Sequence, residues 1–305
     1  MSDLSKPIFH NEAKARAWLE SQIWPDGPVC PHCTSGDATR LEGEAHRDGV
    51  IQCNECRKQY TVTVGTVFER SKLPLTKWLQ AVYLLSASKK GMSTNQLSRM
   101  LGLPYKTAWF MTHRIREAMR EGTFIGGLGG QNKVVEVDET YVGGKAKNAK
   151  HGAPIPNKEP VVSLVERDGK VRSFHLPEVT AKNLGPVLRT QIDRKSYLMT
   201  DESMVYIGVG KEFDGHGTVN HSIEQYVRGV FWHTNTVEGY FAILKRGIMG
   251  SYHHVSQQHL KRYVGEFDFR YNTRDKSDFE RANEALKGIV GKRLTYRRID
   301  EARHA

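Results

Sequence analysis

The sequence has no long uninterrupted run of apolar residues. None of its apolar stretches approaches the roughly 18–20 residues that a membrane-spanning helix needs, although 38% of the 305 residues are hydrophobic. The opening stretch, MSDLSKPIFHNEAKARAWLE, also lacks the basic and apolar pattern of a signal peptide. We therefore expect a cytoplasmic protein with a real core and no membrane partner, and the length favours two or three domains.

Acidic residues are scarce relative to basic ones. There are 34 Asp and Glu residues against 45 Lys and Arg residues, which gives a net charge of +11 and a pI of about 9.4. A basic surplus of this size favours a polyanionic partner, with nucleic acid first. The alternative is a charge that serves only solubility.

Cysteine is rare, and all of it lies in two C-x-x-C pairs. The pairs are CPHC (Cys30 and Cys33) and CNEC (Cys53 and Cys56), with nineteen residues between them. Four thiolates from two tight turns are typical of a tetrahedral, structural Zn²⁺ site with no position left open for catalysis. Residues 58–68, KQYTVTVGTVF, alternate like a pair of strands and so favour a zinc ribbon. Two disulfides are one alternative, which a cytoplasmic setting disfavours. A redox pair is another, and it is disfavoured because two C-x-x-C pairs are present with no thioredoxin-like βαβ pattern around them.

Residues 74–121 carry helix start and stop signals for three helices. Pro74 and Gly91 bracket the first, and Ser93 and Gly102 bracket a short second one. A short helix, a tight turn and a longer third helix form a helix-turn-helix pattern, rich in basic residues. We expect DNA contacts from the third helix, at Tyr105, Lys106, Thr107 and Arg114. A plain three-helix bundle with a solvated basic face is the alternative.

The stretch NKVVEVDETYVGGK, residues 132–145, reads as a strand with acids inside it. Alternation places Val135 and Val137 on one face, with Glu136 and Asp138 on the other, and it points Glu139 away from Asp138. Two further β-like runs flank Asp168-Gly169, which is a hairpin signal. A helix from about Thr180 and a short strand ending at Asp201 follow, so the layout is mixed α/β.

A last helix, HTNTVEGYFAILKRGIMG, carries Glu238 beside its apolar stripe and Lys245 two turns later on the same face. Acids on buried elements are costly unless a cation neutralises them. Asp138, Asp201 and Glu238 could together hold two Mg²⁺ or Mn²⁺ ions for attack on a phosphodiester. Each acid also has an ordinary alternative role, and for Glu238 this is a capping box with Asn235.

The zinc ribbon, the helix-turn-helix, VDETYVGGK, MTDES, HTNTVEGYFAILKRG and EFDFRYNTR occur in one order over nearly the whole chain. In this combination the sequence resembles bacterial insertion-sequence transposases of the DDE type, in the group related to the Merlin transposons. The resemblance implies an RNase H-like catalytic domain, binding of terminal inverted repeats, and Mg²⁺-dependent DNA cleavage and strand transfer. A silent DNA-binding regulator and an RNase H-like nuclease acting on branched nucleic acid are the alternative functions.

Matched residue by residue, the resemblance makes Asp138 and Asp201 the first two catalytic acids. Glu238 is preferred as the third because of its charge, and Asn235 stays as an accessory or alternative third residue. Lys245 and Arg246 are expected to contact DNA phosphate. The implied partner is double-stranded DNA, both transposon ends and target, bound by a homodimer or larger assembly at the nucleoid. The expected parts are an N-terminal helical segment (1–24), the zinc ribbon (25–71), the helix-turn-helix (72–122), a Gly-rich linker (123–131), the catalytic domain (132–285) and a basic tail (286–305).

Overall fold

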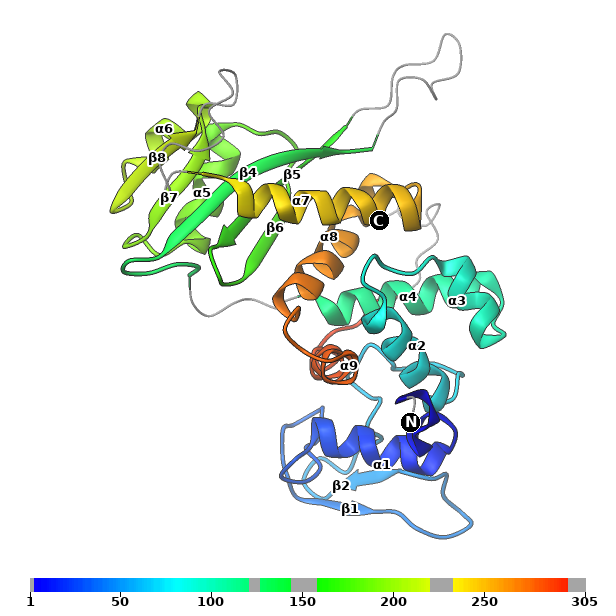
Figure 1. Cartoon of the computed structure of the whole chain (residues 1–305). Helices are drawn as coiled ribbons and strands as arrows, with labels where there is room; N and C mark the ends of the chain where they lie inside the picture. The colour runs from blue at the N-terminus through cyan, green and yellow to red at the C-terminus, as the bar shows by residue number, and fades with distance from the viewer. Residues whose placement is uncertain (1–2, 121–126, 144–157, 220–232, 296–305) are drawn as a thin grey trace, which may run out of the picture. The chain divides into compact units, whose positions relative to one another are not determined.

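The computed structural model describes residues 3–120, 127–143, 158–219 and 233–295 (Figure 1). The chain forms two compact units. The first joins Met1–Arg120 to the C-terminal segment Asp275–Ala305, and the second is Glu121–Arg274. Within the described ranges, no helix has both the length and the apolarity needed to cross a membrane.

The first unit is mainly helical. The short helix predicted between Ser93 and Gly102 begins and ends where the sequence predicts. Ser93 Oγ accepts the amide of Gln96 at its start, and Gly102 ends it with a left-handed φ of 64°. Buried apolar residues such as Leu19, Trp78 and Leu286 form its core. Its elements are the 3₁₀ turns η1 (Asp3–Ser5) and η2 (Pro7–Phe9) and the helices α1 (Glu12–Ile23), α2 (Leu75–Ala87), α3 (Thr94–Leu101), α4 (Tyr105–Met119) and α9 (Asp278–Lys287).

A small antiparallel sheet completes this unit, in the order β1 (Ala38–Arg40), β2 (Ile51–Cys53) and β3 (Gln59–Tyr60). The expected strand pair at residues 58–68 is only partly present, because the ladder stops at Tyr60. After it, the amides of Val64, Thr66 and Glu69 each bond the carbonyl three residues earlier. The alternating apolar side chains there are buried by successive turns and not by a second strand.

The second unit is built on a five-stranded mixed sheet, which confirms the expected α/β layout. The order is β6-β5-β4-β7-β8; β4, β5 and β6 pair antiparallel, while β7 runs parallel to both β4 and β8. The predicted hairpin at Asp168-Gly169 joins β5 to β6, and Asp168 takes a left-handed φ of 55°. The strands are β4 (Val134–Val142), β5 (Glu159–Glu166), β6 (Val171–His175), β7 (Tyr197–Asp201) and β8 (Gly215–Val219).

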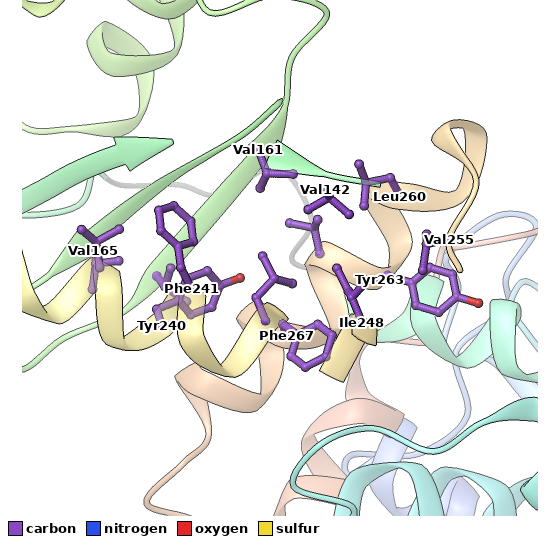
Figure 2. Close-up of a cluster of buried hydrophobic side chains, with 14 residues drawn as sticks. Val142, Val161, Val165, Tyr240, Phe241, Ile248, Val255, Leu260, Tyr263 and Phe267 are labelled. Carbon is purple, nitrogen blue, oxygen red and sulfur yellow. The ribbon is translucent and has the colours of Figure 1, made fainter. Parts of the chain in front are cut away.

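Helices cover both faces of this sheet, as a buried mixed sheet requires. The helices α5 (Ala181–Gln191) and α6 (Met204–Gly210) pack with Val135 and Val137. The helices α7 (Asn235–Gly247) and α8 (Gln257–Asn272), with a π-helical turn η5 (Ile248–Tyr252) between them, pack on the other face. Figure 2 shows Phe241 and Phe267 from these two helices gathered below Val161 of β5. The predicted alternation along β4 is therefore confirmed.

Two expected boundaries differ from the structure. The expected boundary after residue 285 divides α9 between the catalytic domain and the tail, yet the whole helix belongs to the first unit, where it contacts α1, α2 and α4. Its buried side of Ala282, Ala285 and Leu286 needs that apolar partner. The expected linker reaches only partly into the described residues. Within them, Leu128 is buried and its amide bonds Gln191 O at 2.6 Å, so this end of the linker packs on the second unit.

Candidate active site and zinc site

The four cysteines converge in the first unit. Sγ of Cys30 lies 3.6 Å from Sγ of Cys56, and Sγ of Cys33 lies 3.5 Å from Sγ of Cys53. One ligand atom from each lies within 4.8 Å of all the others. Sulfurs held about 2.3 Å from a tetrahedral Zn²⁺ are about 3.8 Å apart, whereas a disulfide requires about 2.0 Å. The arrangement therefore fits a closed Zn(Cys)₄ site and not a disulfide pair.

The surroundings of Cys30 favour its thiolate form. Burial opposes ionisation, but the backbone amides of His32 and Cys33 and the neighbouring thiols lower the pKa of Cys30 to about 7. The amide of His32 lies 3.4 Å from Cys30 Sγ. Thiolates are the form that Zn²⁺ binds, so these amides favour the metal-binding form of Cys30. At Cys33 the amide of Ser35 acts in the same direction, but the neighbouring thiols and burial raise the pKa to about 12.

Asp138 lies in the middle of β4, just beyond the part that pairs with β7, on the face that α7 and α8 cover. It pairs in register with Ser163 of β5, and its Oδ1 accepts the amide of Glu139 at 2.8 Å. Asp201 is the last residue of the neighbouring parallel strand β7, and its Oδ1 accepts the amide of Ser203 at 3.0 Å. Two strands of the sheet thus bring the first two predicted acids together.

The third carboxylate at this point belongs to Glu139, not to the residue expected. Ligand atoms of Asp138, Glu139 and Asp201 all lie within 4.8 Å of one another. Glu139 Oε2 accepts the hydroxyl of Tyr206 at 2.5 Å, and that tyrosine is fully buried on α6. The alternation that points Glu139 toward α6 is correct, but it did not show that its carboxylate still joins the other two.

The cluster is electrostatically strained without a cation. Burial, followed by the negative charges of Glu139, Asp201 and Glu238, raises the pKa of Asp138 to about 6. Burial also raises the pKa of Glu139, and the charge of Asp201 adds to this although the Tyr206 hydroxyl opposes it. Hard oxygen donors grouped in this way are the ligand type that Mg²⁺ and Mn²⁺ prefer, so the donor set fits a divalent metal.

Glu238 lies in the first turn of α7 and is exposed. Its Oε1 accepts the hydroxyl of Thr234 at 3.2 Å. It stands outside the compact cluster, yet its charge acts on Asp138. The alternative capping box with Asn235 is not formed, because Thr234 is the N-cap residue and Asn235 is the exposed first residue of the helix.

The other predicted contacts fall into exposed and buried sets. On α4, Tyr105 and Lys106 are exposed and Thr107 is half-buried. Arg114 differs: it is 6% exposed, its Nη2 donates to Glu69 O at 2.5 Å, and its guanidinium stacks near Trp78. Burial lowers the pKa of Arg114. We therefore correct its predicted role from DNA contact to packing. Lys245 and Arg246 are exposed in the last turn of α7.

Two models of known transposase domains match the parts of the chain that contain these residues. Residues 127–272 match the ISXO2-like transposase domain, and residues 10–59 match the transposase zinc-ribbon domain. The first range holds Asp138, Asp201 and Glu238, and the second holds all four cysteines.

Two individual proteins are similar at lower levels. An uncharacterized protein in transposable element ISH50 of Halobacterium salinarum is 26% identical, over 92% of this chain and 97% of its own length. A chain of the simian T-cell lymphotropic virus intasome, solved in complex with the PP2A regulatory subunit B56 gamma, is 14% identical with a TM-score of 0.29. That match covers 60% of this chain and 66% of the other, and a similarity so low carries no structural argument. On the two domain matches, which together span more than half of the sequence, and the transposable-element relative, the chain belongs to the IS1595 family of DDE transposases.

Proposed function

We propose that this transposase binds the terminal inverted repeats of its own element and catalyses divalent-metal-dependent DNA cleavage and strand transfer. The observation that carries the proposal is the convergence of Asp138, Glu139 and Asp201 where the parallel pairing of β4 and β7 ends. The helix that bears Glu238 packs against the same strand β4. A mixed sheet flanked by helices with acids at this place is the arrangement expected of an RNase H-like catalytic domain.

Four acids would together hold the divalent cations. Asp138 and Asp201 supply oxygens from the sheet, Glu139 adds a third held by Tyr206, and Glu238 completes the set from α7. When bound, divalent cations stabilise the charge that develops on the attacking and leaving oxygens. Lys245 and Arg246, which are exposed in the last turn of the same helix, would bind the DNA backbone.

DNA binding is assigned to the first unit as well. The α3–turn–α4 segment, with Tyr105 and Lys106 exposed at the start of α4, would present side chains to a groove, and the zinc ribbon would contact the repeat beside it. Cutting and joining two ends requires at least two active sites, so the proposed working form is a homodimer or larger assembly on DNA.

The decisive experiment is cleavage of a duplex carrying the element's own terminal repeat, with Mg²⁺ or Mn²⁺. Wild-type protein should release a 3′-hydroxyl at the element end and then join it to target DNA. Asp138→Asn and Asp201→Asn should abolish both steps while repeat binding in a gel-shift assay is kept. Tight binding by the wild type with no cutting in either metal would instead make the protein a regulator.

Substitutions on α7 and β4 would show which of Asn235, Glu238 and Glu139 bind the metal. Glu238→Gln and Asn235→Ala should be compared side by side, and we expect the larger loss of cleavage for Glu238→Gln because only its carboxylate carries charge. Glu139→Gln should also reduce cleavage, through weaker metal binding. If Glu139→Gln cuts like the wild type at limiting metal, Glu139 is not a ligand. Strand-transfer products with repeat ends would exclude a nuclease specific for branched substrates.

A further inference from the structure

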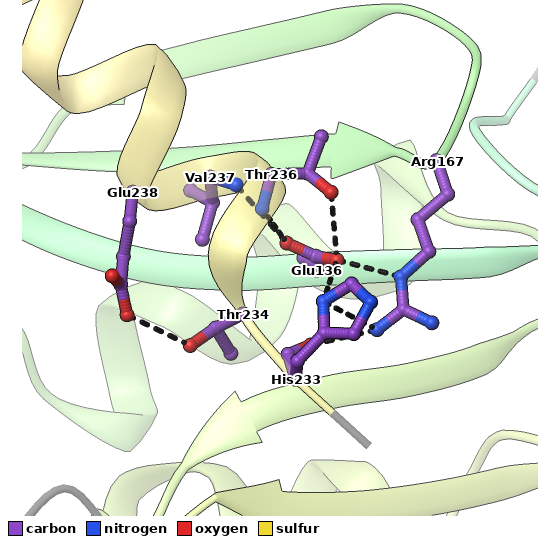
Figure 3. A network of polar contacts seen from close by, with 7 residues as sticks. All are labelled: Glu136, Arg167, His233, Thr234, Thr236, Val237 and Glu238. Carbon is purple, nitrogen blue, oxygen red and sulfur yellow. Dashed lines mark hydrogen bonds and ion pairs between the residues drawn. The ribbon is translucent and has the colours of Figure 1, made fainter. Parts of the chain in front are cut away.

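Glu136, two residues before Asp138 on the same face of β4, is completely buried. It accepts hydrogen bonds from two separate parts of the unit, and His233 Nδ1 lies 3.3 Å from its Oε1 (Figure 3). Arg167 Nε donates to its Oε1 at 2.6 Å, as does Thr236 Oγ1 at 2.9 Å; the amides of Thr236 and Val237 donate to its Oε2 at 2.8 and 3.0 Å. Its carboxylate is thus saturated by protein donors and has no role as a metal ligand.

The amides that Glu136 binds are those of the first turn of α7. No N-cap side chain of the helix serves these groups, since Thr234 makes no capping hydrogen bond to them. The first amides of a helix otherwise lack partners, and the helix dipole favours a negative charge there. A strand carboxylate therefore takes the place of the N-cap, and it ties the beginning of α7 to β4.

Arg167 closes the connection from the other side. Its amide donates to Val134 O at 3.0 Å, and its Nη2 donates to His233 O at 2.7 Å. One residue of the β5–β6 turn, Arg167, therefore joins the start of β4 through its backbone amide and His233, two residues before α7, through its guanidinium. Removal of one partner from a buried ion pair leaves the other charge buried without compensation, and this strongly destabilises the fold.

This network holds the two catalytic elements in one register. Asp138 follows Glu136 by two residues on a rigid strand, and Glu238 follows Thr236 by two residues in the helical turn that Glu136 anchors. We propose that Glu136 is a positioning residue, which sets the place of Glu238 relative to Asp138 and Asp201 and thereby the affinity for the divalent metal. The inference rests on the proposed function, because it takes these acids to be the metal ligands.

The same unit contains a matched buried glutamate without this connection. Glu266 on α8 is also completely buried, and its Oε1 accepts the Tyr252 hydroxyl at 2.7 Å and Arg270 Nη2 at 2.5 Å. None of these three residues belongs to the proposed metal site. Glu266→Gln therefore reports what the loss of a buried, arginine-paired carboxylate costs the fold alone.

The test is direct Mn²⁺ binding to the full-length, zinc-loaded protein, followed by the electron paramagnetic resonance signal of free Mn²⁺. Glu136→Gln should weaken Mn²⁺ binding about 10-fold or more, the range for lost outer-sphere partners of a metal site. Glu266→Gln should bind Mn²⁺ as the wild type does, although both variants melt at lower temperature. Equal Mn²⁺ affinity in Glu136→Gln and the wild type would overturn the proposal.

A double-mutant cycle with Glu238→Gln identifies the route of the effect. If Glu136 acts through Glu238, adding Glu136→Gln to Glu238→Gln should weaken Mn²⁺ binding no further. Independent, additive losses would show that Glu136 does not position Glu238. Should Glu136→Gln fail to fold, Thr236→Val and Thr236→Ser decide. Removal of the hydroxyl in Thr236→Val should weaken Mn²⁺ binding, and Thr236→Ser, which keeps the donor, should restore most of it; equal affinities would refute the proposal.

One further variant separates this inference from the proposed function. Asp201→Asn removes a proposed ligand and leaves the Glu136 network intact. If Asp201→Asn binds Mn²⁺ like the wild type, the metal site itself is wrong. If Asp201→Asn loses Mn²⁺ while Glu136→Gln matches Glu266→Gln, the metal site stands and only the positioning role falls.

Discussion

Asp138 has a raised pKa in the folded chain. It is partly buried among Glu139, Asp201 and Glu238, and its pKa rises from 3.8 to about 6. A carboxyl group whose pKa is higher in the folded chain than in the unfolded chain stabilises the fold at low pH. That contribution is fully present below about pH 4 and is lost as the pH rises through about 6. The metal-free second unit should therefore be less stable at pH 8 than at pH 5.

The substitution Asp138→Asn tests this pH dependence. It should remove most of the difference in melting temperature between pH 5 and pH 8 in protein freed of Mg²⁺ but still loaded with zinc. In free energy of unfolding, this contribution of Asp138 should amount to at most about 3 kcal/mol, because its pKa changes from 3.8 to about 6 and one pKa unit corresponds to about 1.4 kcal/mol. Calorimetry of wild type and variant at both pH values measures it, and added Mg²⁺ should stabilise only the wild type at pH 8. An unchanged pH difference in Asp138→Asn would contradict the assignment.

The sequence predicted the acids that continue a pattern and missed those that break it. Asp138 lies within one apolar strand and Asp201 ends another, and the mixed α/β layout implied that they meet. Alternation turns Glu139 to the face opposite Asp138, and only the fold shows that it binds Tyr206 there and still reaches the cluster. The partners of Glu136 lie about 30 and 100 residues away, at Arg167 and Thr236, and no local pattern indicates such a contact.

The zinc ribbon is a short element that depends on its metal. The strands β1, β2 and β3 have only three, three and two residues, too few to be stable alone. Zn²⁺ binding supplies about 10–16 kcal/mol in comparable small sites. Cys53→Ser should therefore reduce the zinc content from one ion per chain to none and lower the melting temperature of the first unit, as measured by elemental analysis and calorimetry.

His32 provides the control for this variant. It lies within the first knuckle, where only its backbone amide contacts a cysteine sulfur. His32→Ala should keep one zinc per chain. A Cys53→Ser protein with full zinc content would refute the four-cysteine site, and a His32→Ala protein without zinc would add a ligand to it.

Two helices of this chain are capped by a glutamate from a distant element. The start of α7 binds Glu136, and the start of α2, which follows Pro74, binds Glu12 of α1. The Glu12 carboxylate accepts the amides of Leu75 and Thr76 at 2.7 and 3.2 Å. The signals at Ser93, Gly102 and Thr180 located helix ends because their caps are local. A cap formed by a residue far away in the chain gives no local sequence pattern that would predict it.

Removal of the second of these caps should affect only the first unit. Glu12→Ala leaves the amides of Leu75 and Thr76 without their acceptor, so we expect a loss of about 1 kcal/mol, as for other caps. Glu44→Ala, at an exposed glutamate of the same unit, should be neutral. Chemical denaturation gives both values, and Mn²⁺ affinity should stay unchanged in both. Equal stabilities for the two variants would show that the cap contributes nothing.

The path of the chain divides the protein in a way that the motifs do not reveal. The motifs run from zinc ribbon to helices to acids, which suggests a linear series of domains. The chain returns after Arg274, however, and α9 completes the core of the first unit. Each unit has its own buried apolar core, so we expect two separate unfolding transitions.

Matched core truncations assign the two transitions. Leu286 on α9 and Leu188 on α5 are both almost completely buried, in the first and second unit respectively. Leucine-to-alanine changes at such sites cost about 2–5 kcal/mol. Leu286→Ala should lower the melting temperature of the transition that zinc removal also lowers, and Leu188→Ala that of the transition which Mg²⁺ raises. If Leu286→Ala shifts the Mg²⁺-sensitive transition instead, α9 unfolds with the catalytic unit, and its assignment to the first unit is wrong.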